Sequence, residues 1–174
     1  MAGSLVLINS VSVSSSTATV NLTGIDSTYD VYQVVADNIR PDVADLLQIR
    51  VTKSGSAQTD SQYDFAYMQM YTGGTYINEQ GVNLDRWKVP SNFEETTASG
   101  RGNGLVMYLF NFANASEYSF MTLEQAFLHS AGALGGNQGG GVHTVASASD
   151  GVNFYFNSSN NFEEGNFKLY GLRK

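Results

Sequence analysis

Acid–base or nucleophilic chemistry would have to come from very few residues in this chain. Histidine occurs only at His129 and His143, and cysteine is absent, so no thiolate can attack a substrate or bind a metal. Serine is abundant, but the Gly-x-Ser-x-Gly pattern of a hydrolase nucleophile is missing. The Gly100–Gly104 segment lacks the Lys-Ser/Thr pair of a phosphate-binding loop. We therefore expect no enzyme and no cofactor.

Paired carboxylates are the remaining route to hydrolysis, because two such groups can cleave a glycosidic bond. Adjacent residues of a strand point to opposite faces of a sheet, which argues against pairs formed by neighbours in the sequence. We expect solvated loop charges instead. The candidate pairs are Asp60 with Asp64, Glu94 with Glu95, and Glu163 with Glu164.

Calcium would use carboxylate oxygens in loops, and four aspartates lie in or near predicted loops. The Asp-x-Asp-x-Asp-Gly spacing of a calcium-binding loop is missing, so no metal is expected. The four residues are Asp37, Asp42, Asp60 and Asp64.

Composition favours binding through surface contacts. Aromatic residues make up 12% of the chain and charged residues 14%, so much of the surface must be neutral, polar and rich in tyrosine. Such a surface suits contact with protein or sugar. The net charge of −7 argues against nucleic acid and anionic membranes as partners. An exposed aromatic platform for glycan or partner contact would use Trp87, Tyr71, Tyr76 and Phe93; the alternative is that Trp87 anchors a small satellite core.

The elements that must position these residues are strands, because apolar residues repeat every second position. Residues 4–23 predict a hairpin with one buried face. Further strands are indicated by Tyr32, Val34 and Ala36, and by Leu47, Ile49 and Val51.

The middle of the chain is less regular. Residues 57–101 predict either long functional loops or short edge strands. Leu105–Phe110 is continuously apolar, which predicts a central strand buried on both faces. Tyr118–Ala126 fits a strand or a short helix. Six of the ten residues from Gly132 to Gly141 are glycine, which predicts a loop.

The C-terminal region predicts a second hairpin with a turn at 157–161. Val152, Phe154 and Phe156 share one face of its first strand, and Phe167 and Leu169 share a face of its second. Short strands at this spacing, without a linker or repeat, predict one all-β domain over residues 1–174. We expect an antiparallel β-sandwich or jelly roll of roughly eight to ten strands.

The segment from Ser149 to Lys174, SDGVNFYFNSSNNFEEGNFKLYGLRK, resembles the C-terminal signature of a β-sandwich family of phage virion structural and tail-fibre proteins from marine and freshwater bacteriophages. In that family a segment of the form DGIxFYFSSGNIxSGxIxLYGI ends the chain. The similarity extends to residues 7–13, 20–32 and 47–51 and is weak in the middle of the chain. Residues 160–164 depart from the family pattern within a predicted turn.

The resemblance implies a bacteriophage virion protein without enzymatic activity. The chain has no shaft repeat, so we expect a capsid decoration or knob protein; the alternative is a tail-fibre or tail-associated module that binds a host receptor or surface glycan. Expected partners are phage capsid or tail proteins, with self-association possible. The N-terminus does not resemble a signal peptide, and we expect assembly into the virion in the bacterial cytoplasm. Candidate attachment residues are Leu5, Leu7, Gly139 and Gly140.

Overall fold

The computed structural model describes residues 4–93, 103–128 and 133–172. These ranges contain thirteen strands and no helix. The all-β prediction is therefore confirmed, although the strands outnumber the eight to ten expected. They are β1 (Leu5–Val13), β2 (Thr19–Thr23), β3 (Val31–Pro41), β4 (Asp45–Lys53), β5 (Ser56–Ala57), β6 (Tyr63–Tyr71), β7 (Thr75–Leu84), β8 (Trp87–Phe93), β9 (Asn103–Phe110), β10 (Ser119–Leu128), β11 (Leu134–His143), β12 (Gly151–Phe156) and β13 (Phe162–Leu172).

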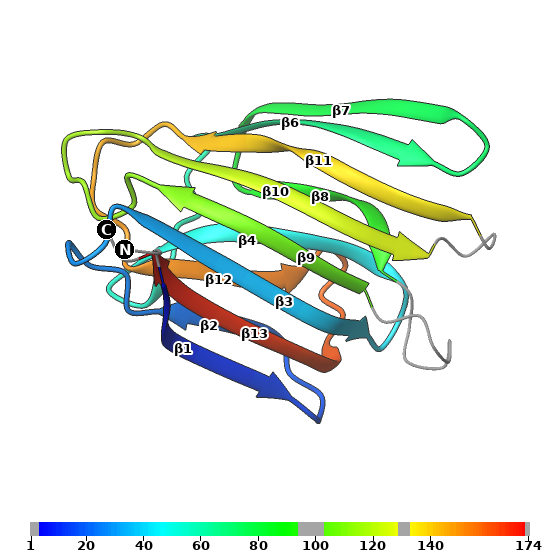
Figure 1. The fold of residues 1–174 in the computed structure, drawn as a ribbon, viewed down its shortest axis with the longest axis horizontal. Helices are drawn as coiled ribbons and strands as arrows, with labels where there is room; N and C mark the ends of the chain where they lie inside the picture. Colours follow the sequence, from blue (N-terminus) through cyan, green and yellow to red (C-terminus); the bar gives the residue numbers. More distant parts are fainter. Residues whose placement is uncertain (1–3, 94–102, 129–132, 173–174) are drawn as a thin grey trace.

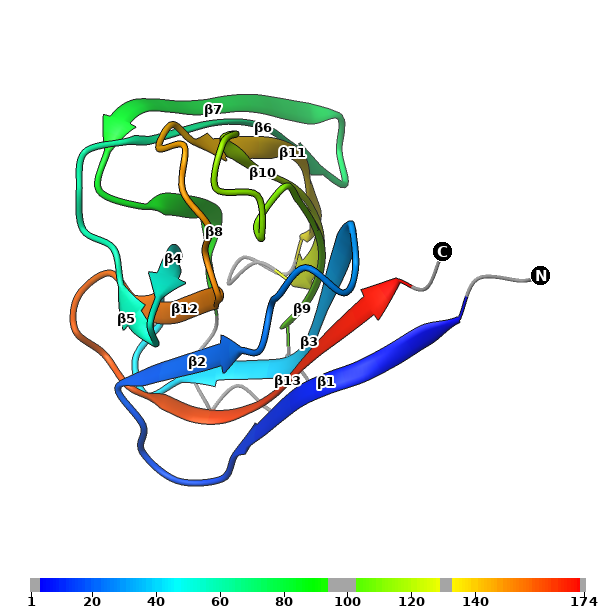
Figure 2. The same ribbon diagram turned by 90° about the vertical axis from the view of Figure 1, so that its left-hand side faces the viewer.

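The strands form two antiparallel sheets that pack as a sandwich (Figure 1). The large sheet has eight strands in the order β1-β13-β3-β9-β10-β11-β6-β7. The small sheet has the order β2-β12-β4-β5, and β8 also pairs with β4. The large sheet is the wider of the two, so its β6–β7 end reaches beyond the small sheet (Figure 2).

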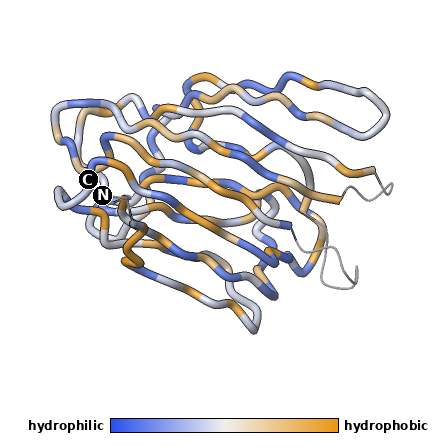
Figure 3. Tube along the Cα trace, in the orientation of Figure 1, coloured by the Kyte–Doolittle hydropathy of each residue, from blue (hydrophilic) through white to orange (hydrophobic). Residues whose placement is uncertain are grey.

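The core lies between the sheets and follows the two-residue alternation of the sequence, which is visible along several strands in Figure 3. Leu47, Ile49 and Val51 of β4 are fully buried, as their spacing predicts. Strand β9 differs from its prediction, because only one of its faces is buried. Met107 lies in the core, whereas Tyr108 on the opposite face is exposed.

Both predicted hairpins are wrong in their pairing. Strand β1 pairs with β13 in the large sheet, whereas β2 pairs with β12 in the small sheet, so the chain changes sheet after β1. It changes sheet again between β12 and β13. The prediction of which side of each strand is apolar and buried is correct. In the C-terminal hairpin, however, the two apolar sides meet across the core instead of lying side by side in one sheet. The ring centroids of Phe156 and Phe162 are 4.5 Å apart, and those of Phe154 and Phe167 are 5.3 Å apart.

The glycine-rich segment is also not a loop in its described part. Strand β11 pairs with β10 on one side and with β6 on the other, and β10 is a strand rather than a helix. Gly139 and Gly141 are needed on the inner face, where aromatic side chains pass over the strand. A Cβ at Gly139 would lie 2.6 Å from Tyr67 Cδ1, and a Cβ at Gly141 would lie 2.6 Å from Trp87 Nε1.

Candidate functional site

The predicted aromatic platform does not exist as a surface. Trp87 and Phe93 are completely buried, so the prediction that they contact a glycan or partner is wrong. The Trp87 Nε1–H donates to the carbonyl oxygen of Val142 at 3.1 Å, and its ring meets Tyr63 edge to face. The alternative interpretation of Trp87 as a core residue is correct, although it belongs to the main core and not to a satellite.

The two tyrosines of the predicted platform lie apart from that buried pair. Tyr76 is 67% exposed on strand β7. Tyr71 is half-buried at the end of β6, where its ring packs edge to face on Phe127 at 5.8 Å between centroids. Of the predicted four, Tyr76 alone therefore offers a largely exposed ring.

The four predicted attachment residues are also separated. Leu5 and Leu7 are exposed on β1, at one edge of the large sheet. Gly139 and Gly140 lie within β11, near the other edge. Gly139 turns to the inner face beneath Tyr67, so it cannot contact a partner there; Gly140 faces the other way.

Several of these residues lie on the same side of the large sheet, although on distant strands. The sequence did not indicate this surface. We call the side of the large sheet that is turned away from the small sheet the outer face. Among the described residues, eleven large apolar side chains are exposed. Eight of them lie on the outer face, seven by strand register and Val82 by its place in a hollow on that face: Leu5, Leu7, Met68, Tyr76, Val82, Tyr108, Phe120 and Leu134.

The outer face contains a hollow of about 530 Å³ over strands β10, β11 and β6. Gly140 supplies part of its floor, since it adds no side chain between Thr122 and Ala66, its partners on the neighbouring strands. The walls are mainly apolar, with Asp64, Gln80 and Thr122 as polar residues of the lining. We call this site the outer hollow; its apolar walls are Phe110, Phe120, Val142 and Val82.

The inner and outer glycines of β11 differ in what covers them. The inner glycines lie under aromatic rings of the same chain. On the outer face, an added Cβ at Gly140 would meet only backbone atoms around Met121 and Thr122. Gly140 therefore leaves this part of the floor of the outer hollow without a covering side chain.

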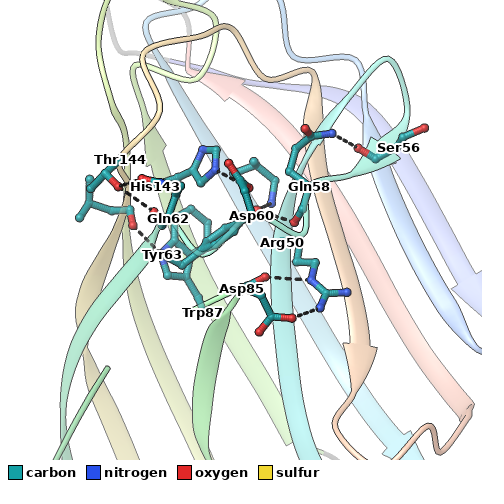
Figure 4. Close-up of polar contacts among 12 residues, drawn as sticks. Arg50, Ser56, Gln58, Asp60, Gln62, Tyr63, Asp85, Trp87, His143 and Thr144 are labelled. Atoms are coloured by element: carbon teal, nitrogen blue, oxygen red, sulfur yellow. Dashed lines mark hydrogen bonds and ion pairs between the residues drawn. The ribbon is translucent and has the colours of Figure 1, made fainter. Parts of the chain in front are cut away.

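A polar cluster near the end of β11 holds the only histidine in the described part of the chain (Figure 4). The side chain of His143 is fully buried, and its Nε2 lies 3.3 Å from Oδ1 of Asp60. Burial lowers the pKa of His143, and the hydrogen bond with Asp60 opposes this only in part. The ring is therefore neutral near pH 7, and its Nδ1 has no hydrogen-bond partner.

The contacts around His143 hold strands and loops together. Tyr63 donates from its hydroxyl to the carbonyl oxygen of Gln58 at 2.9 Å, and burial raises the pKa of this phenol. Thr144 Oγ1 bonds to Gln62 rather than to the histidine. Within the described residues the His143–Asp60 pair thus has no hydroxyl nucleophile hydrogen-bonded to it.

The nearby Asp85 carboxylate lies between two guanidinium groups. Burial acts to raise its pKa, but the hydrogen bond from Arg50 and the charge of Arg86 outweigh burial and lower it. The Arg50 guanidinium also lies 4.5 Å above the ring of Tyr155. This cluster ties β4, the β7–β8 turn and β12 together.

The candidate carboxylates have separate structural partners. Asp64 Oδ1 accepts from the backbone N–H of Asn83 at 2.7 Å, whereas Asp60 faces His143. Glu164 accepts from Asn38 Nδ2 at 3.0 Å and lies 3.6 Å from Arg40.

Two other candidate positions, His129 and the Glu94–Glu95 pair, lie outside the described residues. In the ranges that the structure covers, no three His, Asp or Glu side chains gather as metal ligands would. No helix in those ranges is long and apolar enough to cross a membrane.

Comparison with known proteins gives no family assignment. No protein-family model matches the chain, and a search of curated proteins finds no match. A function for this chain therefore has to be inferred from its own surface.

Proposed function

We propose that this protein is a non-enzymatic structural protein of a bacteriophage particle surface, most consistent with a capsid decoration or knob protein. It contacts neighbouring particle proteins through the outer face of the large sheet. The observation that carries this proposal is that eight of the eleven large apolar side chains exposed within the described ranges lie on that one face.

Physical chemistry supports a binding role for the outer face. Scattered exposed apolar residues are normal, but apolar side chains gathered around one hollow, as Phe120 and Val82 are, often mark a contact site. Burying apolar surface contributes roughly 25 cal/mol per Å², so covering side chains such as Phe120 and Val82 would stabilise a complex. The polar residues between them, including Thr122 and Gln80, can form the hydrogen bonds that give such a contact its specificity.

The virion assignment draws on the C-terminal resemblance. Its aromatic residues form part of the core, with Phe154, Phe156 and Phe167 at most 1% exposed. The segment therefore supports a shared scaffold and says nothing about the target. The target has to be inferred from the outer face.

Two neighbouring side chains provide a matched test of the outer face. Phe120 is 45% exposed and borders the outer hollow, whereas Tyr118 is 46% exposed in the preceding turn and does not line it. We expect Phe120→Asp to reduce incorporation of the protein into phage particles at least about tenfold, since each 1.4 kcal/mol of lost contact is a factor of ten. Quantitative immunoblotting of purified particles gives the measurement.

Tyr118→Asp is the control and should be incorporated at the wild-type level. Equal incorporation of both variants, with unchanged folding by circular dichroism, would remove the outer face from the proposal. Absence of the wild-type protein from purified particles would overturn the virion assignment itself.

The outer hollow also favours a second candidate function, a tail-associated module that binds host glycan. The exposed ring of Phe120 lies beside a hydroxyl and an amide, Thr122 and Gln80, and sugars bind to such combinations of apolar and polar groups. This candidate predicts that the purified wild-type protein binds host surface polysaccharide and that Phe120→Asp does not. A protein that enters particles without binding polysaccharide would favour decoration.

A further inference from the structure

The part of the large sheet that carries the outer hollow has no positive charge of its own. Five neighbouring strands, β9, β10, β11, β6 and β7, contain no lysine and no arginine (Figure 1). Their register turns two carboxylates to the outer face, Asp64 on β6 and Glu124 on β10. Glu79 of β7 pairs with the buried Tyr67 and points to the inner face. The outer face over these strands is therefore apolar and acidic.

Asp64 is the one charged residue among the described residues that line the outer hollow. The side chain is half-buried, and its Oδ1 accepts from the backbone N–H of Asn83 at 2.7 Å. None of the ion pairs between described residues includes Asp64. Within the described ranges its negative charge is therefore not matched by a cation.

Apolar side chains lead up to this carboxylate across the sheet. Phe110, Phe120, Val142 and Asp64 face one another in register on the outer face of β9, β10, β11 and β6. Facing side chains on adjacent strands have Cβ atoms about 4.5–5.5 Å apart, so the row is continuous. Coulomb attraction is stronger beside apolar groups than in open water, because the effective dielectric constant is lower. The row thus combines an apolar surface with a carboxylate at its end.

We infer that the outer hollow takes an arginine side chain of the partner protein, with the guanidinium on Asp64 and the aliphatic stem along Val142 towards Phe120. This inference rests on the proposed particle contact and names the chemistry of the partner's surface there. Charge complementarity selects the occupant, because the hollow has a carboxylate and the strands around it have no cation.

The choice of arginine over lysine follows from the apolar walls. A guanidinium binds a carboxylate through two parallel N–H donors, is more weakly hydrated than an ammonium and stacks on aromatic rings. A lysine ammonium would lose more hydration beside Val142 and Phe120 and would form only a point contact with Asp64.

Two blocked amino acids test the inference on the purified full chain. Nα-acetyl-arginine-N-methylamide is compared with the corresponding citrulline compound, which has a similar shape and no charge. Each is titrated into isotope-labelled protein, and the backbone amides are followed by NMR. The arginine compound should shift the amides of Asn83, Gly140 and Val142, and the citrulline compound should bind at least about tenfold more weakly. Added salt should weaken the binding of arginine.

Two substitutions that each remove one carboxylate separate the site from the general charge of the face. Asp64→Asn retains an oxygen that can accept from the N–H of Asn83, so the fold should be kept. This variant should lose the preference for arginine over citrulline. Glu124→Gln removes the same charge from the same face but outside the outer hollow, and it should keep the preference.

Equal binding of arginine and citrulline by the wild-type protein would overturn the inference, and this comparison needs no variant. A preference for arginine that Asp64→Asn retains, or that Glu124→Gln abolishes to the same extent, would also contradict it. A hollow that binds host polysaccharide and shows no preference for arginine would be a glycan site instead.

The titration uses protein without particles, so its outcome is separate from that of the proposed function. Wild-type protein that enters particles but shows no preference for arginine would overturn this inference and leave the proposed function intact. A preference for arginine that depends on Asp64, in a protein absent from purified particles, would support the site and overturn the virion assignment.

Discussion

At the scale of single residues, His143 makes stability depend on pH. Burial lowers its pKa from 6.5, so the unfolded chain binds a proton more readily than the folded one. The neutral ring therefore contributes stability above about pH 6.5, and that contribution is lost as the pH falls. We expect the free energy of unfolding to decline from pH 7 to pH 5, and His143→Gln to have a shallower decline, measured by urea titration.

Asp60 provides the internal check on this pH dependence. Its carboxylate partly offsets the burial of His143, so removing it should lower the pKa of His143 further. Asp60→Asn should therefore show a steeper loss of stability below pH 6.5 than the wild type. A wild-type stability that does not change between pH 7 and pH 5 would contradict this interpretation.

Trp87 gives the second prediction at this scale. It is fully buried, so Trp87→Ala should lower the free energy of unfolding by about 3–5 kcal/mol, the usual cost of deleting a large core ring. Tyr76→Ala, at an exposed position, should change it by less than about 0.5 kcal/mol. Guanidinium unfolding measures both. Equal effects of the two substitutions would contradict the assignment of Trp87 to the core.

At the scale of elements, strand β11 depends on glycine for close packing. A Cβ at Gly139 would lie 2.2 Å from the carbonyl oxygen of Ala66, whereas at Gly136 the nearest atom is the carbonyl oxygen of Gln125 at 3.3 Å. Gly139→Ala should therefore destabilise the protein by about 1–3 kcal/mol, and Gly136→Ala by less. Thermal unfolding of the two variants gives the comparison; similar melting temperatures would contradict it.

The strands show what the sequence could predict and what it could not. Alternation correctly identified core residues such as Leu47 and Ile49, because the side-chain period of a strand is local. Pairing is not local: Phe154 and Phe167 belong to different sheets although a short turn connects their strands. The glycines of β11 resemble a loop in sequence because the rings that cover them come from other segments.

The outer hollow could not be predicted from the sequence, because it too depends on how distant strands pair. Phe120 falls on the polar side of the alternation in β10, together with Thr122 and Glu124. An apolar residue in that position was a detectable signal of an exposed contact. Its gathering with Val82 and Phe110 depends on strand order, which the sequence does not reveal.

At the scale of the whole molecule, two features of the large sheet suit assembly. Its outer face offers apolar contact area, and its β7 edge offers backbone hydrogen bonds. The net charge of −7 keeps copies apart unless specific contacts join them, so apolar patches and edges have to supply the binding energy. Together they suit the proposed role of a building block that binds through a sheet.

An electron-microscopy map of the native phage particle tests the central claim most directly. The proposal predicts density for the β-sandwich on the particle surface, with the outer face of the large sheet, including Phe120 and Val82, buried against a neighbouring particle protein. A particle without this protein, or one in which that face points to solvent while another surface makes the attachment, would contradict it.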